Sequence, residues 1–338
     1  MIELIATHLY MMLLVLIISA LGILFGLLYR GVDRVLAARM QARVGPPVTQ
    51  PFRDVRKLMM KESIVPASAV RWLFNLMPVI ALASSMLILL YLPVFGLAPV
   101  LEGHGDMILI LYMLLFPSLA IVIGGFASGS PYATVGAQRE MVTMISYEFP
   151  LAIAVVSVAW LMAVAGTGVA VFSLGTITSV PVWSLVGPLG AAGLLVLFFV
   201  MLLVMPGELG TIPFDVAEAE TELAGGVLVE YSGRNLALFY LADAVKMIVM
   251  ASVIIALFLP WGISGAMGLQ GISSAAADAM FFMVKVFGVV FFGSTFIRIA
   301  VARPRINQVV KAYWGYATLA AFIGLLLIGL DIYLGAAI

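Results

Sequence analysis

The sequence contains no cysteine and only two histidines among its 338 residues. Without cysteine, the chain can form no disulfide, no thiolate zinc site and no cysteine-ligated iron–sulfur cluster. The sequence also lacks a glycine-rich phosphate loop and an HExxH motif, which argues against the common nucleotide and zinc-hydrolase sites. We therefore expect no cofactor or metal in this chain, and any redox chemistry should belong to partner subunits.

Charged residues are also scarce, because they make up 10% of the sequence whereas hydrophobic residues make up 64%. An ordinary soluble domain is about 45–50% apolar and about 25% charged, so a soluble fold cannot bury this much apolar surface. In lipid, backbone polar groups must be satisfied within the protein, which leaves helices or closed barrels as spanning structures. The apolar stretches run for about 20 residues without strict alternation, which predicts helices.

We predict an all-α, polytopic transmembrane bundle of about eight spans, forming a single membrane domain over residues 1–338. The predicted spans are 8–29, 73–92, 107–126, 144–165, 187–205, 236–259, 279–299 and 313–334. The first apolar run lacks a basic leading region and a small-residue cleavage site, so we interpret it as a retained span.

Positive charge indicates the orientation of the bundle. Nearly all of the Lys and Arg residues lie in alternate connecting segments, at 30–72, 127–143, 206–235 and 300–312. The three segments between them hold none. By the positive-inside rule, the basic segments are cytoplasmic, which predicts a multi-pass protein of the cytoplasmic membrane with both termini outside.

The first cytoplasmic loop, 30–72, is basic, with nine basic and three acidic residues for a net charge of +6. Such a loop can serve as an orientation signal that contacts anionic lipid. Its residues 55–66 have amphipathic helical spacing and end at a proline, so this segment can also lie in the interface or dock a soluble partner.

A second cytoplasmic loop, 206–235, is acidic, and its residues 207–231 carry no basic residue. Its six carboxylates are those of Glu208, Asp215, Glu218, Glu220, Glu222 and Glu230. They repel one another unless basic groups face them, and we expect the first loop to supply those groups. The sequence from Pro213 to Glu218 predicts a helix start, and Gly225 with Gly226 predicts its end. The alternative is a solvated acidic loop.

Ionisable residues also lie inside the predicted spans. Glu140 and Glu148 are about 12 Å apart along a helix and within roughly 80° around it, so they can line one cavity. Because an ionised carboxylate in lipid is costly, Glu148 should face protein or water, or be protonated. Proton transfer and a structural polar contact both fit these two glutamates.

Basic residues are found at membrane depth as well. Asp243 and Lys246 are three residues apart and can pair on one helix. Lys285 has no partner within a turn of its own helix, so it should find a carboxylate on another helix, reach water or lose its proton. It is a candidate for a relay to an adjacent subunit.

Three long motifs carry a resemblance to a known family. They are RMQARVGPPVTQPFRDVRKLMMKESIVP at 39–66, QREMVTMISYEFP at 138–150 and PFDVAEAETELAGGVLVEYSG at 213–233. In this order, across nearly the whole chain, they resemble the H subunit of respiratory complex I and its hydrogenase relatives. The resemblance implies an eight-span protein at the junction of a peripheral redox arm and a proton-pumping arm, with a quinone chamber and a glutamate-lined channel.

Carried over position by position, the resemblance implies roles for the matching residues. The channel and the acidic loop correspond to Glu140, Glu148, Asp215, Glu218, Glu220, Glu222 and Glu230. A proton path would continue through Asp243, Lys246 and Lys285. The basic segment lining the chamber, or facing the redox arm, corresponds to Arg39, Gln41 and Arg43. The amphipathic helix that follows corresponds to Asp54, Lys57, Lys61 and Glu62.

Departures from the quinone-linked members favour one branch of the family. The sequence runs GPPVTQP directly, where those members carry an insertion, and Asp33 and Asn307 replace their usual glutamate and aspartate. With Lys285, the short form resembles the energy-converting [NiFe] hydrogenases.

This branch implies an anchor and coupling subunit that links redox chemistry to proton or sodium translocation. Its expected partners are the hydrogenase large and small subunits carrying [NiFe] and iron–sulfur clusters, a ferredoxin-like iron–sulfur subunit, antiporter-like membrane subunits and lipid, with no nucleic acid. The alternatives are a quinone- or methanophenazine-site subunit of a complex I-like oxidoreductase, a stand-alone secondary transporter and a purely structural anchor.

Overall fold

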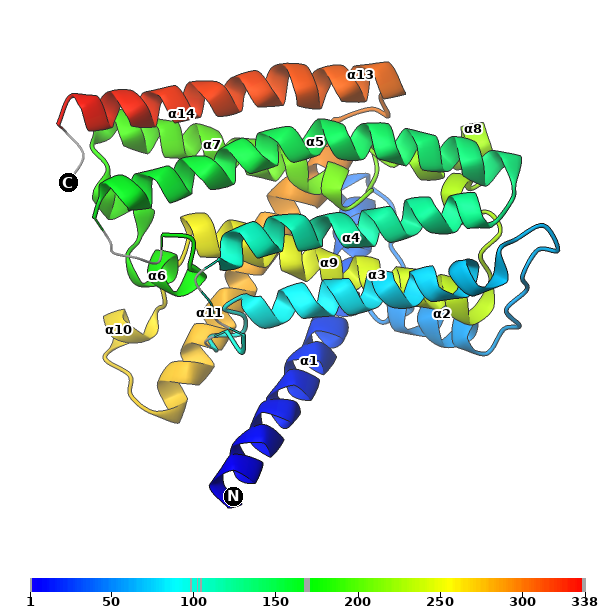
Figure 1. The fold of residues 1–338 in the computed structure, drawn as a ribbon, viewed down its shortest axis with the longest axis horizontal. Coiled ribbons are helices and arrows are strands. Elements are labelled where there is room, and N and C mark those ends of the chain that lie inside the picture. The colour runs from blue at the N-terminus through cyan, green and yellow to red at the C-terminus, as the bar shows by residue number, and fades with distance from the viewer. Residues whose placement is uncertain (1, 98, 102, 104, 167–170, 336–338) are drawn as a thin grey trace.

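The computed structural model describes residues 2–97, 99–101, 103, 105–166 and 171–335, without the side chains of 2–8, 220 and 221. Within this part of the chain the structure is helical, with no strand (Figure 1). Eight of the described helical segments are long and apolar enough to span a membrane, which confirms the predicted fold class. They are α1 (Ile2–Met40), α3 (Arg71–Tyr91), α4 (Asp106–Ala127), α5 (Pro131–Val164), α7 (Pro188–Glu208), α9 (Gly233–Phe258), the segment Ile272–Ala300 and the segment Ile306–Tyr333.

The last two spans each contain a π-helical segment, in which one turn is wider than in an α-helix. The seventh span consists of α11 (Ile272–Val290), η4 (Phe291–Phe296) and α12 (Ile297–Ala300). The eighth consists of α13 (Ile306–Val310), η5 (Lys311–Ala317) and α14 (Thr318–Tyr333).

Two helices extend further than the apolar runs predicted. Helix α1 continues to Met40 and α5 begins at Pro131, so much of the predicted loops 30–72 and 127–143 is helical. Proline at the first helical position favours this start, because its missing N–H would have no partner there. Polar residues can continue a helix once it leaves the hydrocarbon, and hydropathy alone does not register them. As a result, Glu140 lies within α5.

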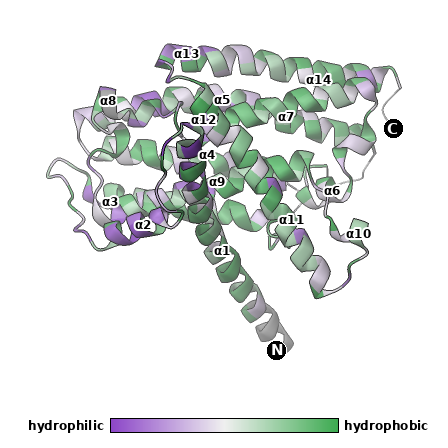
Figure 2. Ribbon diagram, turned by 180° about the vertical axis from the view of Figure 1, so that it is seen from behind, coloured by the Kyte–Doolittle hydropathy of each residue, from purple (hydrophilic) through white to green (hydrophobic). Residues whose placement is uncertain are grey.

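The predicted amphipathic helix lies earlier than expected. Helix α2 spans Gln50–Met59, not 55–66, and it begins with Pro51 in its first turn. The prediction was wrong because residues 63 and 64 pair with another segment: the Ile64 N–H donates to Ser232 Oγ at 3.0 Å, and Ser63 Oγ accepts from the Arg234 N–H at 3.0 Å. Figure 2 shows many hydrophilic residues, in purple, along α2. We call the end of the bundle that carries α2 the basic end.

Helix α9 is the centre of the bundle. Every residue from 244 to 258 is buried, as expected for a helix that is apolar on all sides. Helices α1, α3, α7 and α11 pack against it. Small residues allow close helix contacts: Gly26 of α1 lies against the backbone of Ala244, and Gly193 of α7 lies against Gly324 of α14.

Short elements close the two ends of the bundle. Away from the basic end lie α6 (Leu174–Ser179), η1 (Val182–Leu185) and α10 (Ser264–Met267) (Figure 1). The acidic segment, residues 209–232, contains η2 (Val216–Glu218), α8 (Glu220–Leu223) and η3 (Gly226–Leu228). The helix predicted to start near Asp215 is therefore a single 3₁₀ turn followed by one turn of α-helix. Gly225, with φ of 104°, follows α8 as predicted.

Candidate functional site

The acidic segment is packed against the helices and is not a freely solvated loop. Val216, Ala217 and Val227 are buried. Gly136 of α5 faces Val227 and Ala217 so closely that a Cβ atom would lie 2.5 Å from the Val227 nitrogen and 2.8 Å from the Ala217 oxygen. This contact sets the acidic segment directly on α5, beside Glu140.

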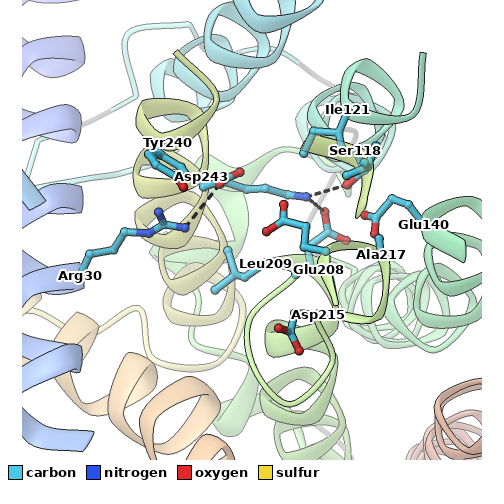
Figure 3. Close-up of a pocket in the computed structure, with 14 residues that line it drawn as sticks. Arg30, Ser118, Ile121, Glu140, Glu208, Leu209, Asp215, Ala217, Tyr240 and Asp243 are labelled. Carbon is cyan, nitrogen blue, oxygen red and sulfur yellow. Dashed lines mark hydrogen bonds and ion pairs between the residues drawn. The ribbon is translucent and has the colours of Figure 1, made fainter. Parts of the chain in front are cut away.

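A cavity of about 120 Å³ lies where the acidic segment meets α1, α4, α5, α7 and α9 (Figure 3). We call it the carboxylate cavity, because five carboxylates and two cations of the described residues line it. Its ionisable residues are Arg30, Glu140, Glu208, Asp215, Glu218, Tyr240, Asp243 and Lys246. The structure thus brings together five of the predicted path residues, namely Glu140, Asp215, Glu218, Asp243 and Lys246.

A buried ion pair forms one wall of the cavity. Lys246 Nζ on α9 lies 2.8 Å from Glu208 Oε1 at the end of α7, and both residues are 3% exposed. The same ammonium donates to Ser118 Oγ of α4 at 2.8 Å. Ser118 Oγ lies 3.3 Å from the hydroxyl of Tyr147 on α5. Four helices therefore share one hydrogen-bonded chain in the protein interior.

The predicted pair on α9 does not form. Asp243 Oδ2 instead accepts from Arg30 Nη2 of α1 at 3.5 Å, while Lys246 turns to Glu208. Partners on α1 and α7 lie closer than the residue one turn away, and spacing along α9 cannot reveal them. The prediction of an Asp243–Lys246 pair was wrong, although both residues line the cavity.

Two carboxylates of the cavity have no cation of their own. Glu208, Asp215 and Asp243 form ion pairs, whereas Glu140 and Glu218 form none within the described part of the chain. A partly buried carboxylate without a cation is stabilised only by protons, water or other polar groups. The charges of Glu140 and Glu218 must therefore be balanced by a proton, by water or by polar neighbours.

Within the described residues, the ion pairs of the acidic segment come from elements other than the first loop, although Arg30 of that predicted loop lines the same cavity as Glu218. Asp215 Oδ2 accepts from Arg303 Nη2 at 2.6 Å, and Glu222 pairs with Arg139 of α5. Burial raises the pKa of Asp215, although Arg303 opposes this shift. The hydrogen bond and the charge of Arg139 lower the pKa of Glu222.

The pKa of Glu218 leads to a test by pH. Burial raises it from 4.5 to about 8, and the carboxylates of Asp243 and Glu140 act in the same direction. Between these two values the folded protein holds a proton that the unfolded chain has released. The stability from this proton is therefore complete below pH 4.5 and is lost as the pH rises through about 8.

We expect Glu218→Gln to unfold at the same temperature as the wild type at about pH 4 and at a higher temperature at about pH 9. Thermal unfolding of the purified complex at both pH values measures this difference. Glu222→Gln is the matched control: this carboxylate is exposed and has a lowered pKa, so no gain is expected at high pH. Equal unfolding temperatures for Glu218→Gln and the wild type at both pH values would contradict the assignment.

The remaining path residues lie outside the cavity lining. Glu148 of α5 is half-buried, and its Oε1 is buried with no hydrogen-bond partner among the described atoms. Lys285 of α11 donates to backbone oxygens at the opposite end of the bundle. Glu230 is half-buried near the end of the acidic segment. The side chain of Glu220 lies outside the described residues.

The predicted interface residues lie on the surface of the basic end. Most of them are exposed, namely Arg39, Gln41, Arg43, Lys57, Lys61 and Glu62. Asp54 is half-buried and accepts from Arg34 and Gln50, each at 2.8 Å. The surface beside them includes a hollow of about 480 Å³ between the end of α1 and residues 43–48. These features suit contact with a soluble or lipid-borne partner.

Several residues that line the cavity, or that contact its lining, were not predicted as site residues. Glu208 was counted only as a loop charge, and Arg30 only as part of the basic loop. Ser118 and Tyr147 were not singled out. The sequence offered one weak indication for each: Ser118 places a hydroxyl in the middle of an apolar span, and Tyr147 directly precedes Glu148. Arg303 had no signal, because its partner Asp215 is distant in sequence.

The comparisons identify the family to which this architecture belongs. The sequence model of the NADH dehydrogenase family matches residues 11–329. This chain belongs to the H-subunit family of NADH dehydrogenases. It is 34% identical over 236 residues to hydrogenase-4 component C of Escherichia coli, covering 70% of this chain and 71% of that protein. It is 33% identical over 309 residues to the H subunit of NADH-quinone oxidoreductase of Geobacillus sp., covering 87% of each.

A solved structure extends the likeness to the fold. The membrane-bound sulfane sulfur reductase, an archaeal respiratory membrane complex, contains a chain that matches with a TM-score of 0.80 at 25% identity. The match covers 94% of this chain and 99% of that one. This member of the H-subunit family is therefore a multi-pass membrane component of a complex I-like assembly, with other subunits as partners. The alternative of a stand-alone transporter is not supported.

Proposed function

We propose that this subunit anchors and couples an energy-converting hydrogenase complex, linking a peripheral [NiFe] and iron–sulfur arm to proton or sodium translocation. The observation that carries the proposal is the carboxylate cavity, in which Glu140 and Glu218 have no cation within the described residues. The clusters would lie in partner subunits and supply the redox chemistry. This chain would take up protons, or respond to shifts of charge, at its buried carboxylates.

The geometry suggests an order for the path. Asp215 and Glu218 lie on the acidic segment, and Glu140 of α5 lines the same cavity. Glu208 and Lys246 then lead into the hydrogen-bonded chain through Ser118. Hydrogen-bonded ionisable and hydroxyl groups are the usual carriers of protons at membrane depth. Antiporter-like neighbours would receive the protons or the change in charge.

Two observations favour the hydrogenase branch of the family: the short connection at the basic end and the likeness to a hydrogenase component. The sequence GPPVTQP joins α1 to α2 without an inserted segment, and hydrogenase-4 component C is 34% identical to the chain. Exposed Arg39, Arg43 and Lys57 would face the soluble hydrogenase subunits, and a ferredoxin-like iron–sulfur subunit would deliver electrons to them.

A second candidate is a subunit that binds quinone or methanophenazine. The likeness to the H subunit of NADH-quinone oxidoreductase and the hollow beside Arg39 and Arg43 favour it. The two candidates differ in the electron acceptor and in the co-purifying subunits. Mass spectrometry of the purified complex distinguishes them, because it detects either a nickel-binding large subunit or a bound lipid-soluble carrier.

The coupling role predicts a large effect at Glu140. We expect Glu140→Gln in the assembled complex to slow coupled ion transport about 10²-fold or more, because a positioned proton-transfer group contributes at least that much. Transport into proteoliposomes and redox turnover are measured on the same preparation. Glu148→Gln tests the continuation of the path in the same assay.

The matched comparison is Glu222→Gln: the sequence placed this glutamate in the path, but the structure leaves it exposed, paired with Arg139 and outside the cavity lining. It should transport and turn over like the wild type. If Glu140→Gln and Glu148→Gln both left turnover and transport intact, the cavity would be a structural polar cluster and the subunit a passive anchor.

A further inference from the structure

Tyr313 of the eighth span is a buried tyrosine that does not line the carboxylate cavity. It is 2% exposed, and its hydroxyl is buried without a hydrogen-bond partner among the described atoms. Tyr313 lies in the π-helical segment η5, and π-helical turns occur frequently at functional sites. Thr318 holds the backbone there, because its N–H and its hydroxyl both donate to the Tyr313 carbonyl oxygen, the hydroxyl at 3.0 Å.

The side chain of Tyr313 contacts three other elements of the protein. Its ring meets the ring of Tyr147 on α5 edge to face, with centroids 6.2 Å apart. The ring of Phe214, on the acidic segment, lies 5.0 Å from it on the same measure. The hydroxyl end lies against Gly207 of α7, where an added Cβ would be only 2.6 Å from the hydroxyl oxygen. One side chain of the eighth span therefore contacts α5, α7 and the acidic segment.

The three contacted residues share one feature, since each directly precedes a carboxylate of the proposed path. The pairs are Tyr147 with Glu148, Gly207 with Glu208, and Phe214 with Asp215. Consecutive Cα atoms are about 3.8 Å apart, so an element that shifts at Tyr313 carries its carboxylate with it. The contacts of a single ring thus bear on the spacing of three carboxylates that come from three different elements.

Two more interactions connect Tyr313 with the rest of the site. Arg303, just before the eighth span, pairs with Asp215 Oδ2 at 2.6 Å, so the start of this span holds the acidic segment by an ion pair as well as by the ring contact. On the other side, Tyr147 belongs to the hydrogen-bonded chain that includes Lys246. Tyr313 therefore lies between the acidic segment and the buried chain.

We propose that Tyr313 is a positioning residue of the proton path, whose ring sets the distances among Glu148, Glu208 and Asp215. This inference rests on the proposed coupling function. The ring carries the role, because the hydroxyl has no partner among the described atoms. Proton transfer requires a donor and an acceptor within hydrogen-bond reach, directly or through one water. A small shift of one element at Tyr313 is therefore enough to slow it.

Four variants separate the ring from the hydroxyl and from general effects on the span. Tyr313→Leu removes the ring, whereas Tyr313→Phe keeps the ring and removes only the hydroxyl. Phe214→Leu removes the contact from the side of the acidic segment and tests the proposal even if Tyr313→Leu does not assemble. Tyr316→Leu is the matched control, because Tyr316 lies in the same π-helical segment but is 67% exposed.

Hydrogen–deuterium exchange of the assembled complex measures the positioning without any transport assay. We expect exchange in the acidic segment to rise about two- to tenfold in Tyr313→Leu and in Phe214→Leu, the factor that corresponds to the loss of one aromatic pair. Tyr313→Phe and Tyr316→Leu should exchange like the wild type.

Coupled ion transport per redox turnover is then measured on the same preparations. It should fall about tenfold or more in Tyr313→Leu, because a misplacement of about 1 Å can cost about 10²-fold. The pH dependence of transport should also shift, because the interaction between carboxylates depends on their separation. A variant that only assembles poorly would lower the yield and keep the pH dependence. Tyr313→Phe should retain both the wild-type rate and the wild-type pH dependence.

Wild-type exchange and transport in assembled Tyr313→Leu or Phe214→Leu would overturn the proposal. A loss of transport in Tyr313→Phe with wild-type exchange would also overturn it, because the hydroxyl and not the ring would then be required. Glu140→Gln separates this inference from the proposed function. If Glu140→Gln slows transport and Tyr313→Leu does not, only the positioning role is wrong; if neither slows it, both are wrong.

Discussion

Lys246→Met is expected to destabilise the protein by about 3–5 kcal/mol, the cost of leaving one member of a buried ion pair without its partner. Lys246 and Glu208 are each 3% exposed, and their charged atoms are 2.8 Å apart. Without the ammonium, Glu208 must remain charged in the interior or take up a proton, and Ser118 loses its donor. The yield of assembled complex and its thermal unfolding measure the loss.

Two further variants determine whether the uncompensated charge is the cause. Lys246→Met combined with Glu208→Gln leaves no buried charge at this pair, so we expect it to recover most of the stability but not the ion transport. Lys311→Met removes an exposed lysine from the eighth span and should change stability by no more than about 0.5 kcal/mol. If the single variant were as stable as the double, the uncompensated charge of Glu208 would not be the cause of the loss.

The fold could be predicted from the sequence because lipid imposes a simple rule on it. Each span must be an apolar run of about 20 residues, and eight such runs were visible. The ends of the helices were harder to predict from the sequence. The apolar runs end near residues 29 and 144, but α1 and α5 continue to Met40 and from Pro131, where packing against protein replaces lipid as the reason for the helix.

The site was only partly visible, for a physical reason. The sequence showed which ionisable residues lie at membrane depth, because such residues are costly there. It could not show their partners, because the pairs join residues far apart in the chain. Arg30 meets Asp243, and Lys246 meets Glu208. Helical spacing alone favoured a neighbour one turn away.

The acidic segment is a second case in which the sequence did not reveal the ion-pair partners. Its carboxylates needed cations, and the basic first loop was the obvious source by charge count. The fold instead places Arg139 and Arg303 beside Glu222 and Asp215. The acidic segment is held in place by tertiary packing. The close backbone contacts of this packing are visible in the sequence only as glycines.

Gly226→Ala should therefore have the second large effect, with a loss of about 2–5 kcal/mol. Gly226 has φ of +57°, which costs other residues about 1–2 kcal/mol. An added Cβ would also overlap the Ala217 carbonyl, and overpacking costs about 1–3 kcal/mol more. The substitution should displace η2 from η3 and move Glu218 out of the cavity. Proteolysis of the acidic segment and the yield of assembled complex report this change.

Gly210→Ala separates the cost of a positive φ from the cost of the steric overlap with Ala217. Gly210 has the same φ of +57°, but its Cβ would meet nothing within 4 Å, so only the conformational cost of about 1–2 kcal/mol should appear. The difference between the two variants measures how tightly the acidic segment is packed. A segment that moves freely during ion transport would tolerate both substitutions equally. A rigid one, in which protons move between fixed carboxylates, would tolerate only Gly210→Ala.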